Sequence, residues 1–141
     1  RRFNEYEKRR TIMIKDKIIL DASAILALIN NEKGKDIVEQ YLSNALISVI
    51  NFSEVITVTN RNGFDQEQIS NLLKNIFPNI VDFNYDQSLI AASIDQYTSK
   101  FGLSLGDRAC LSLAKYKNCS ILTADKIWKK LDIGLEIKLI R

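Results

Sequence analysis

The fold is decided by residues 103–125, LSLGDRACLSLAKYKNCSILTAD. Apolar side chains recur at helical spacing through Ala109 and Leu113, which predicts an amphipathic helix over 105–118. A short apolar run follows at 119–124 and predicts a buried strand. A helix that leads directly into a strand is typical of a chain that builds a parallel sheet.

The same alternation continues on both sides of this stretch. Strand patterns lie at 17–20, 45–50, 80–83, 119–124 and 135–140. Helical patterns lie between them, at 21–31, 35–44, 51–63, 64–77, 85–102, 105–118 and 125–131. This order predicts an α/β fold with three layers, in which helices flank a mostly parallel central sheet.

The composition is that of a globular protein. The chain has 141 residues, of which 46% are hydrophobic and 26% charged, enough for one domain to bury a core without disulfides. No apolar run approaches the roughly 20 residues that span a membrane, and the first residues lack the apolar segment of a secretory signal. We therefore expect a cytoplasmic domain without a membrane segment. Cys110 and Cys119 match no common zinc spacing and are expected to be free, buried thiols.

The net charge of +3 belongs to the amino-terminal tail. Residues 1–12 carry five basic and two acidic side chains, whereas residues 13–141 carry 15 of each. Met13 is the only methionine, and the regular pattern begins soon after it. We expect residues 1–12 to be a basic tail, upstream of the natural start or added to it, and residues 13–141 to form a single domain.

The chain contains no histidine. This absence excludes a Ser-His-Asp triad, a Cys-His pair and paired-histidine ribonuclease chemistry, each of which needs an imidazole. Catalysis at neutral pH would then depend on carboxylates, lysines, hydroxyls or a metal ion.

Four carboxylates fall at one end of the predicted sheet. Asp21 and Asp125 each directly follow a strand, Glu54 lies four residues beyond one, and Asp107 opens the helix that leads into the Asp125 strand. Open α/β sheets bind ligands at this edge. Carboxylates that share a cleft repel one another unless a cation is present, and an oxygen-only set suits Mg²⁺ or Mn²⁺. Because such an ion activates water and neutralises phosphoryl oxygens, the pattern points to phosphoester chemistry.

Three of the acids also have a structural explanation. Asp21 and Asp125 are good helix N-caps, and Asp107 lies three residues after Ser104, as in a capping box. Glu54 is harder to explain in this way because it lies in the apolar stretch FSEVITV, where a buried acid needs a specific partner.

Four segments together resemble the motifs of PIN-domain ribonucleases, and specifically the VapC toxins of bacterial type II toxin–antitoxin systems. They are ILDASAILALINNEKG (19–34), ISVINFSEVI (47–56), LSLGDRACLSLA (103–114) and ILTADKIW (121–128). The resemblance covers essentially all of 17–141. It implies a PIN-like fold and a metal-dependent endoribonuclease that cleaves RNA.

The resemblance also implies a role for each acid. Asp21 and Asp107 would be the most direct ligands of Mg²⁺ or Mn²⁺. Glu54 would complete the ligand shell or orient the attacking water, and Asp125 would bind a second ion or act through water.

Three polar side chains are expected near these acids. Ser23 and Thr123 match hydroxyl positions that flank the site and would support the ligands, with helix-start and strand packing as the alternative. Asn51 can also contact the site, with a role as an N-cap as its alternative.

Partners follow from the same resemblance. It implies a homodimer that is neutralised by a cognate VapB-type antitoxin. The family pattern has no counterpart of residues 1–12, whose basic run can be a solvated arm or a tethered inhibitor over the acidic cleft.

Candidate RNA contacts are less distinctive. Arg108 can hold a phosphate or pair with a carboxylate, and Trp128 can stack on a base, although a core or dimer role is favoured. Five lysines either steer phosphates or form a solvated face: Lys115, Lys117, Lys126, Lys129 and Lys130. Three aromatic residues are expected in the core: Tyr41, Phe64 and Phe77.

Other functions fit the sequence less well. An aspartyl-phosphate phosphatase needs an Asp-x-Asp pair after the first strand, where this chain has Ser23. A phospho-acceptor domain needs an aspartate at the end of a central strand, and ISVINFSE has none. A non-catalytic module that binds nucleic acid or protein is the alternative that stays open.

Overall fold

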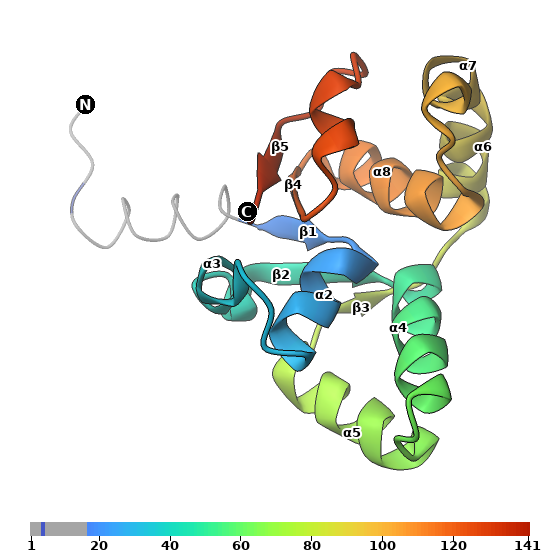
Figure 1. Ribbon diagram of the computed structural model, residues 1–141. Helices are drawn as coiled ribbons and strands as arrows, with labels where there is room; N and C mark the ends of the chain where they lie inside the picture. Colours follow the sequence, from blue (N-terminus) through green and yellow to red (C-terminus); the bar gives the residue numbers. More distant parts are fainter. Residues whose placement is uncertain (1–3, 5–16) are drawn as a thin grey trace.

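The structure, a computed structural model, describes Asn4 and residues 17–141. Five strands form one sheet in the order β3-β2-β1-β4-β5, and every pair is parallel (Figure 1). The strands are β1 (Ile18–Leu20), β2 (Ala45–Ser48), β3 (Ile80–Val81), β4 (Ser120–Thr123) and β5 (Ile137–Leu139). The predicted α/β fold is therefore confirmed. The predicted basic tail falls almost wholly outside the described residues.

Seven α-helices lie in the described part of the chain. They are α2 (Ala22–Ile29), α3 (Lys35–Glu39), α4 (Val49–Arg61), α5 (Gln66–Ile76), α6 (Tyr85–Ser93), α7 (Asp95–Thr98) and α8 (Leu105–Lys117). Short 3₁₀ helices lie within three of the connections: η1 (Leu42–Asn44) before β2, η2 (Ser99–Phe101) before α8, and η3 (Lys126–Lys130) before β5. None of the helices in this part of the chain is long and apolar enough to cross a membrane.

The sheet lies between two helical layers because its side chains alternate between two cores. Ile18 and Leu20 face a core that they share with α2, α3, α4 and α5. Ile19 and Ile121 face the other core, which α8 and the fully buried Trp128 complete. Figure 1 shows α2 to α5 on one side of the sheet and α6 to α8 on the other. This arrangement confirms the three-layer prediction and the core role of Trp128.

The junction of β2 and α4 differs from the prediction. The predicted strand 45–50 ends at Ser48, whose hydroxyl accepts a hydrogen bond from the N–H of Ile50 (3.3 Å) and caps α4. The prediction is therefore wrong in its last two residues, and so is the alternative that Asn51 is an N-cap. Asn51 lies inside the first turn of α4, three residues before Glu54 and on the same helical face.

The predicted helix 85–102 is interrupted at Ile94. Arg108 donates from Nη1 to the carbonyl of Ala91 (3.0 Å), the carbonyl that Asp95 would use in a continuous α-helix. A contact from a distant part of the chain thus coincides with the break. The structure also favours the pairing alternative for Arg108, since its Nε lies 3.7 Å from Oδ1 of Asp95.

The predicted burial of the cysteines and of three aromatic residues is confirmed in part. Cys110 is fully buried and Cys119 half-buried, and both are free thiols. Phe77 is fully buried as expected, and Tyr41 packs half-buried against a core. The core prediction for Phe64 is wrong because the side chain is 55% exposed, just beyond the end of α4.

Gly34 supplies a test of the packing between α3 and the carboxyl-terminal end. It has φ 97°, and a Cβ there would lie 2.6 Å from the carbonyl oxygen of Ile140. We expect Gly34→Ala to lower the free energy of unfolding by about 3 kcal/mol, through left-handed strain and a backbone clash. Urea unfolding followed by circular dichroism would measure the loss.

Gly63→Ala is the matched control. Gly63 has φ 95° but nothing within 4 Å of its would-be Cβ, so only the strain applies and the expected loss is about 1 kcal/mol. Equal losses in the two variants would contradict the clash at Gly34.

Candidate active site

Three acidic side chains from three elements meet at the carboxyl edge of the sheet. Asp21 follows β1 and caps α2, Glu54 lies in the second turn of α4, and Asp107 lies in the first turn of α8. Burial raises the pKa values of Asp21 and Glu54, and the charge of Asp107 raises both further. Burial raises the pKa of Cys110 in α8, and the charges of the three acids raise it further. The three carboxylates therefore lie near one another, with the Cys110 thiol close by.

Asp21 is the most buried of the acids, with 5% of its surface exposed. Its Oδ1 accepts hydrogen bonds from the N–H of Ala24 (2.9 Å) and the hydroxyl of Ser23 (2.7 Å). Its Oδ2 accepts from the hydroxyl of Thr123 (2.6 Å). Burial nevertheless raises the pKa of Asp21 from 3.8 to about 6, because these hydrogen bonds offset only part of the lost hydration and Asp107 adds repulsion.

The raised pKa of Asp21 has a consequence for stability. The folded chain holds a proton on this carboxyl more tightly than the unfolded chain does, so the resulting stability is fully present below pH 3.8. It is lost as the pH rises through about 6. At neutral pH the folded chain thus contains a buried carboxylate whose charge is unfavourable there, and a cation beside it would stabilise that charge.

The two predicted hydroxyls, those of Ser23 and Thr123, donate to the Asp21 carboxylate and also connect two parts of the chain. The Ser23 hydroxyl accepts from the N–H of Ala124 (2.9 Å), and the Thr123 hydroxyl accepts from the N–H of Asp125 (3.0 Å). The two hydroxyl oxygens lie 3.3 Å apart. The start of α2 is therefore fixed to the segment that follows β4, with the Asp21 carboxylate held between them.

Glu54 is held by an amide and a glycine. Its Oε1 accepts a hydrogen bond from Nδ2 of Asn51 (2.8 Å), and the same nitrogen donates to the carbonyl of Gly106 (3.0 Å). A Cβ at Gly106 would overlap the Glu54 carboxylate, lying 2.8 Å from its Cδ. Partial burial raises the pKa of Glu54, the Asn51 hydrogen bond lowers it, and Asp107 raises it again.

Asp107 forms the predicted capping box. Its Oδ2 accepts from the N–H of Ser104 (2.9 Å), and its own N–H donates to the Ser104 hydroxyl (3.2 Å). Among the described residues nothing donates a hydrogen bond to Oδ1 of Asp107. Asp107 therefore caps α8 through one oxygen, while the other accepts no hydrogen bond from the described residues.

Asp125 lies at the rim of this group. It is exposed, and its Oδ1 accepts from the N–H of Ile127 (3.1 Å), which makes it the cap of η3. Its backbone N–H connects it to Asp21 through the Thr123 hydroxyl. The structure thus brings three of the four predicted acids together and places the fourth beside them.

The donors present suit a hard divalent cation, although they are not yet arranged as its ligands. All are carboxylate oxygens, which Mg²⁺ and Mn²⁺ prefer. Over the stretch 17–141, no three acidic or thiol groups already stand in a metal-binding arrangement. The hydrogen bonds from Asn51 and Ser104 engage Oε1 of Glu54 and Oδ2 of Asp107, so the second oxygen of each carboxylate could bind a cation directly or through water.

Two features of the site were not predicted from the sequence. Gly106 was not singled out, because the need for a residue without a side chain depends on how closely Glu54 approaches from another helix. The Asn51–Glu54 contact could have been found from their three-residue spacing if the start of α4 had been placed after Ser48.

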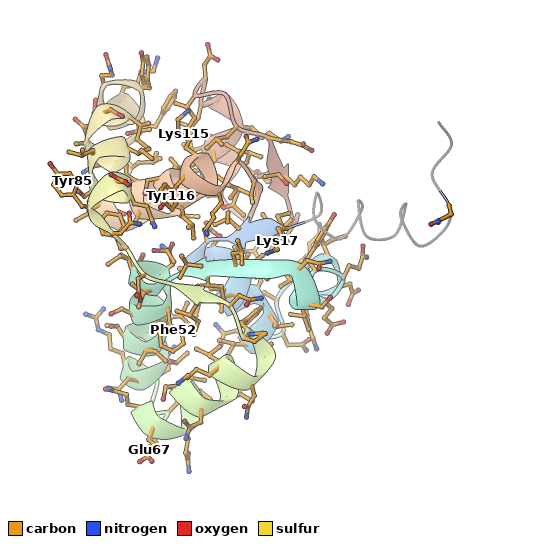
Figure 2. All side chains as sticks on the ribbon, turned by 180° about the vertical axis from the view of Figure 1, so that it is seen from behind. Lys17, Phe52, Glu67, Tyr85, Lys115 and Tyr116 are labelled. Atoms are coloured by element: carbon orange, nitrogen blue, oxygen red, sulfur yellow. The ribbon has the colours of Figure 1, made fainter. Side chains whose placement is uncertain are left out.

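The predicted lysine cluster divides into two groups. Lys115 and Lys117 lie in the last turns of α8, about 12 and about 15 Å along the helix from Asp107. Lys115 instead donates to the carbonyl of Ile133 (2.6 Å), on the side of the molecule that Figure 2 shows. The other three lysines are exposed in η3, directly after Asp125: Lys126, Lys129 and Lys130.

Comparison with known proteins connects this arrangement to solved structures. The fold is similar to that of DNA-bound VapBC from Salmonella typhimurium (TM-score 0.69, 15% identity, 89% of this chain and 98% of that chain). It is also similar to VapBC2 from Rickettsia felis bound to a promoter DNA fragment (0.69, 17%, 86% and 97%). A third similar structure is a toxin–antitoxin complex from Klebsiella pneumoniae (0.66, 19%, 88% and 98%).

Sequence comparison gives the family. No curated protein matches the chain at a significant level. The family model of the PIN domain matches residues 18–134, which include all four predicted acids. The chain therefore belongs to the PIN-domain family.

Proposed function

We propose that this protein is a metal-dependent endoribonuclease that acts as a VapC-type toxin and is neutralised by a cognate antitoxin. One observation carries the proposal: Asp21, Glu54 and Asp107, distant in sequence, come together at the carboxyl edge of a parallel sheet. The Glu54 carboxylate lies against Gly106, next to Asp107, and the charge of Asp107 adds to burial in raising the pKa values of Asp21 and Glu54. A fold gains nothing from gathering like charges. The arrangement is therefore best explained by a cation and a phosphodiester substrate.

The comparisons support the same proposal. The chain belongs to the PIN-domain family, and three similar solved structures are described as toxin–antitoxin or VapBC complexes. The four segments that resemble VapC motifs contain the acids, the hydroxyls and the glycine that make up the site.

The proposed cofactor is Mg²⁺, with Mn²⁺ as a substitute, held by Asp21 and Asp107 with Glu54 completing the shell. When bound, such an ion activates a water for attack on phosphorus and neutralises charge on the phosphoryl oxygens. Asp125 would bind a second ion or act through water.

The side chains of the protein have separate tasks in this mechanism. Ser23 and Thr123 fix the orientation of the Asp21 carboxylate by donating to both of its oxygens. The capping box fixes Asp107 through Oδ2 and leaves Oδ1 for the site. Glu54, with its raised pKa, is suited to orient the attacking water or to receive its proton.

We assign an exposed apolar surface to contacts with partner proteins. Large apolar side chains that are at least half exposed lie near α5 and on α6, among them Phe64 (55%), Tyr85 (76%) and Leu89 (53%). Figure 2 shows Tyr85 at the outer side of α6. Exposed apolar side chains of this size suit protein–protein contacts, and we assign them to the antitoxin and to a homodimer.

We expect Asp21→Asn and Asp107→Asn to lower RNA cleavage at saturating Mg²⁺ by at least about 100-fold, because each removes a charged ligand. Both variants should fold, since asparagine is as good an N-cap as aspartate and can still accept from Ser104. Cleavage of a fluorescent RNA measures the effect. Growth arrest on expression gives a second readout, which Asp107→Asn should abolish.

Asp65→Asn is the matched control. Asp65 caps α5 by accepting from the N–H of Gln68 (3.1 Å), so it shares the capping role of Asp21 and lies in another helix. This variant should cleave RNA as the wild type does. If Asp21→Asn and Asp107→Asn also cleave at full rate, the site is wrongly assigned and the chain is better explained as a binding module.

The pKa of Asp21 predicts how metal binding depends on pH. Protons and the cation compete for the same carboxylate, so affinity falls as the pH drops below about 6. Between pH 7.5 and 5.5 we expect the dissociation constant of Mn²⁺, measured by calorimetry, to rise by at least about fourfold for a group with this pKa. Asp21→Asn should bind Mn²⁺ more weakly at both pH values and with a smaller dependence on pH. Tighter binding at pH 5.5 would contradict the assignment.

A further inference from the structure

Asn51 makes a contact that the proposed mechanism does not use. Its side chain is 1% exposed, and its Nδ2 donates both to Oε1 of Glu54 (2.8 Å) and to the carbonyl of Gly106 (3.0 Å). The first bond stays within α4, and the second crosses to the first turn of α8. Gly106 directly precedes Asp107. One amide thus connects α4, which contains Glu54, with the residue that precedes Asp107 in α8.

The orientation of this amide is fixed by its partners. Both partners of Nδ2 are acceptors, so exchanging the nitrogen and oxygen would set Oδ1 against a carboxylate and a carbonyl. In the orientation present, Oδ1 is buried and accepts no hydrogen bond from the described residues. A buried acceptor without a donor is unfavourable for folding. The contribution of this side chain therefore lies in the two hydrogen bonds that Nδ2 donates.

The space around Glu54 supports the same conclusion. The carboxylate lies so close over the Cα of Gly106 that a Cβ there would overlap it. The Asn51 amide and the bare Gly106 backbone thus hold the carboxylate from two sides. Any displacement of Glu54 from α8 would break the hydrogen bond from Asn51 or leave the Gly106 carbonyl without its donor.

We propose that Asn51 is a positioning residue that sets the place of Glu54 relative to Asp107, by binding the Glu54 carboxylate and the backbone of Gly106 with one amide nitrogen. The inference rests on the proposed function, because the distance between these two acids matters only if they share a cation. Asn51 acts through Glu54 and does not itself contact substrate. Residues that orient a metal ligand typically change metal affinity by about 10–100-fold when they are replaced.

The first test replaces Asn51 with two side chains of similar size. Asn51→Leu removes the donor, and Asn51→Asp turns it into a third acceptor. We expect each to weaken Mn²⁺ binding by about 10-fold or more, measured by calorimetry with the metal alone. RNA cleavage at saturating substrate should fall while KM changes little, because the substrate contacts remain. Using both variants keeps the test valid if one of them does not fold.

Gln87 is the matched control for folding. Its side chain is also fully buried, donates from Nε2 to a carbonyl, that of Asp82 (2.9 Å), and leaves Oε1 without a donor in the described part of the chain. It forms no hydrogen bond with the acids within that part. Gln87→Leu should therefore lower stability as Asn51→Leu does, and leave Mn²⁺ affinity within about twofold of the wild type.

A double-mutant cycle shows whether Asn51 acts through Glu54. If it does, Asn51→Leu should have little further effect on Mn²⁺ affinity once Glu54→Gln is present. Additive effects of the two changes would overturn the inference. So would wild-type affinity in folded Asn51→Leu and Asn51→Asp.

Gly106→Ala provides an independent displacement of Glu54 with Asn51 intact. The added methyl group would push the carboxylate away, so Mn²⁺ affinity should fall as it does in Asn51→Leu. Unchanged affinity in Gly106→Ala would contradict the role of this contact. Wild-type protein that neither binds Mn²⁺ nor cleaves RNA would overturn the proposed function and this inference together. Wild-type activity with unaffected Asn51 variants would overturn this inference alone.

Discussion

The hydrogen bond from the Thr123 hydroxyl to the buried carboxylate of Asp21 is the contact on which the site depends. It joins the ends of the central strand β1 and its neighbour β4, whose pairing runs from Ile18 and Ser120 to Leu20 and Leu122. The sheet therefore fixes where Asp21 lies before any helix is considered. The helices α4 and α8 then bring Glu54 and Asp107 to that point, because both begin at the same edge of the sheet.

Helix capping and clustering of the acids are compatible in this protein. Asp21 accepts from the N–H of Ala24, and Asp107 accepts from the N–H of Ser104, so each uses an oxygen to satisfy backbone donors at the start of a helix. Helix N-termini also carry partial positive charge, which favours carboxylates there. The remaining repulsion is still evident, since burial and Asp107 raise the pKa of Asp21 to about 6 despite these donors. The structural explanation of these residues and the chemical one thus describe the same atoms.

The order of strands and helices was predictable because hydrophobic periodicity is a local property. One of the errors has a local cause, and another coincides with a contact from a distant part of the chain. The run ALISVI at 45–50 looks like one strand, but the Ser48 hydroxyl ends it by capping α4. The break at Ile94 involves Arg108, fourteen residues later, and no local pattern could predict it. The convergence of Asp21, Glu54 and Asp107 was predicted because Asp21 and Glu54 follow strands and Asp107 opens a helix that leads into one. The rim position of Asp125 did not, because an N-cap and a metal ligand have the same sequence pattern.

Three features that do not favour folding lie where the acids meet. Asp21 is a buried carboxylate, Asn51 leaves a buried oxygen without a donor in the described chain, and Gly106 is a glycine within a helix, where it is less favourable than alanine by about 0.5–1 kcal/mol. Two of the three belong to one set of contacts, since Asn51 binds the backbone of Gly106 and both contact Glu54. The contacts of Asn51 and Gly106 hold Glu54 beside Asp107, an arrangement that the proposed shared cation would explain.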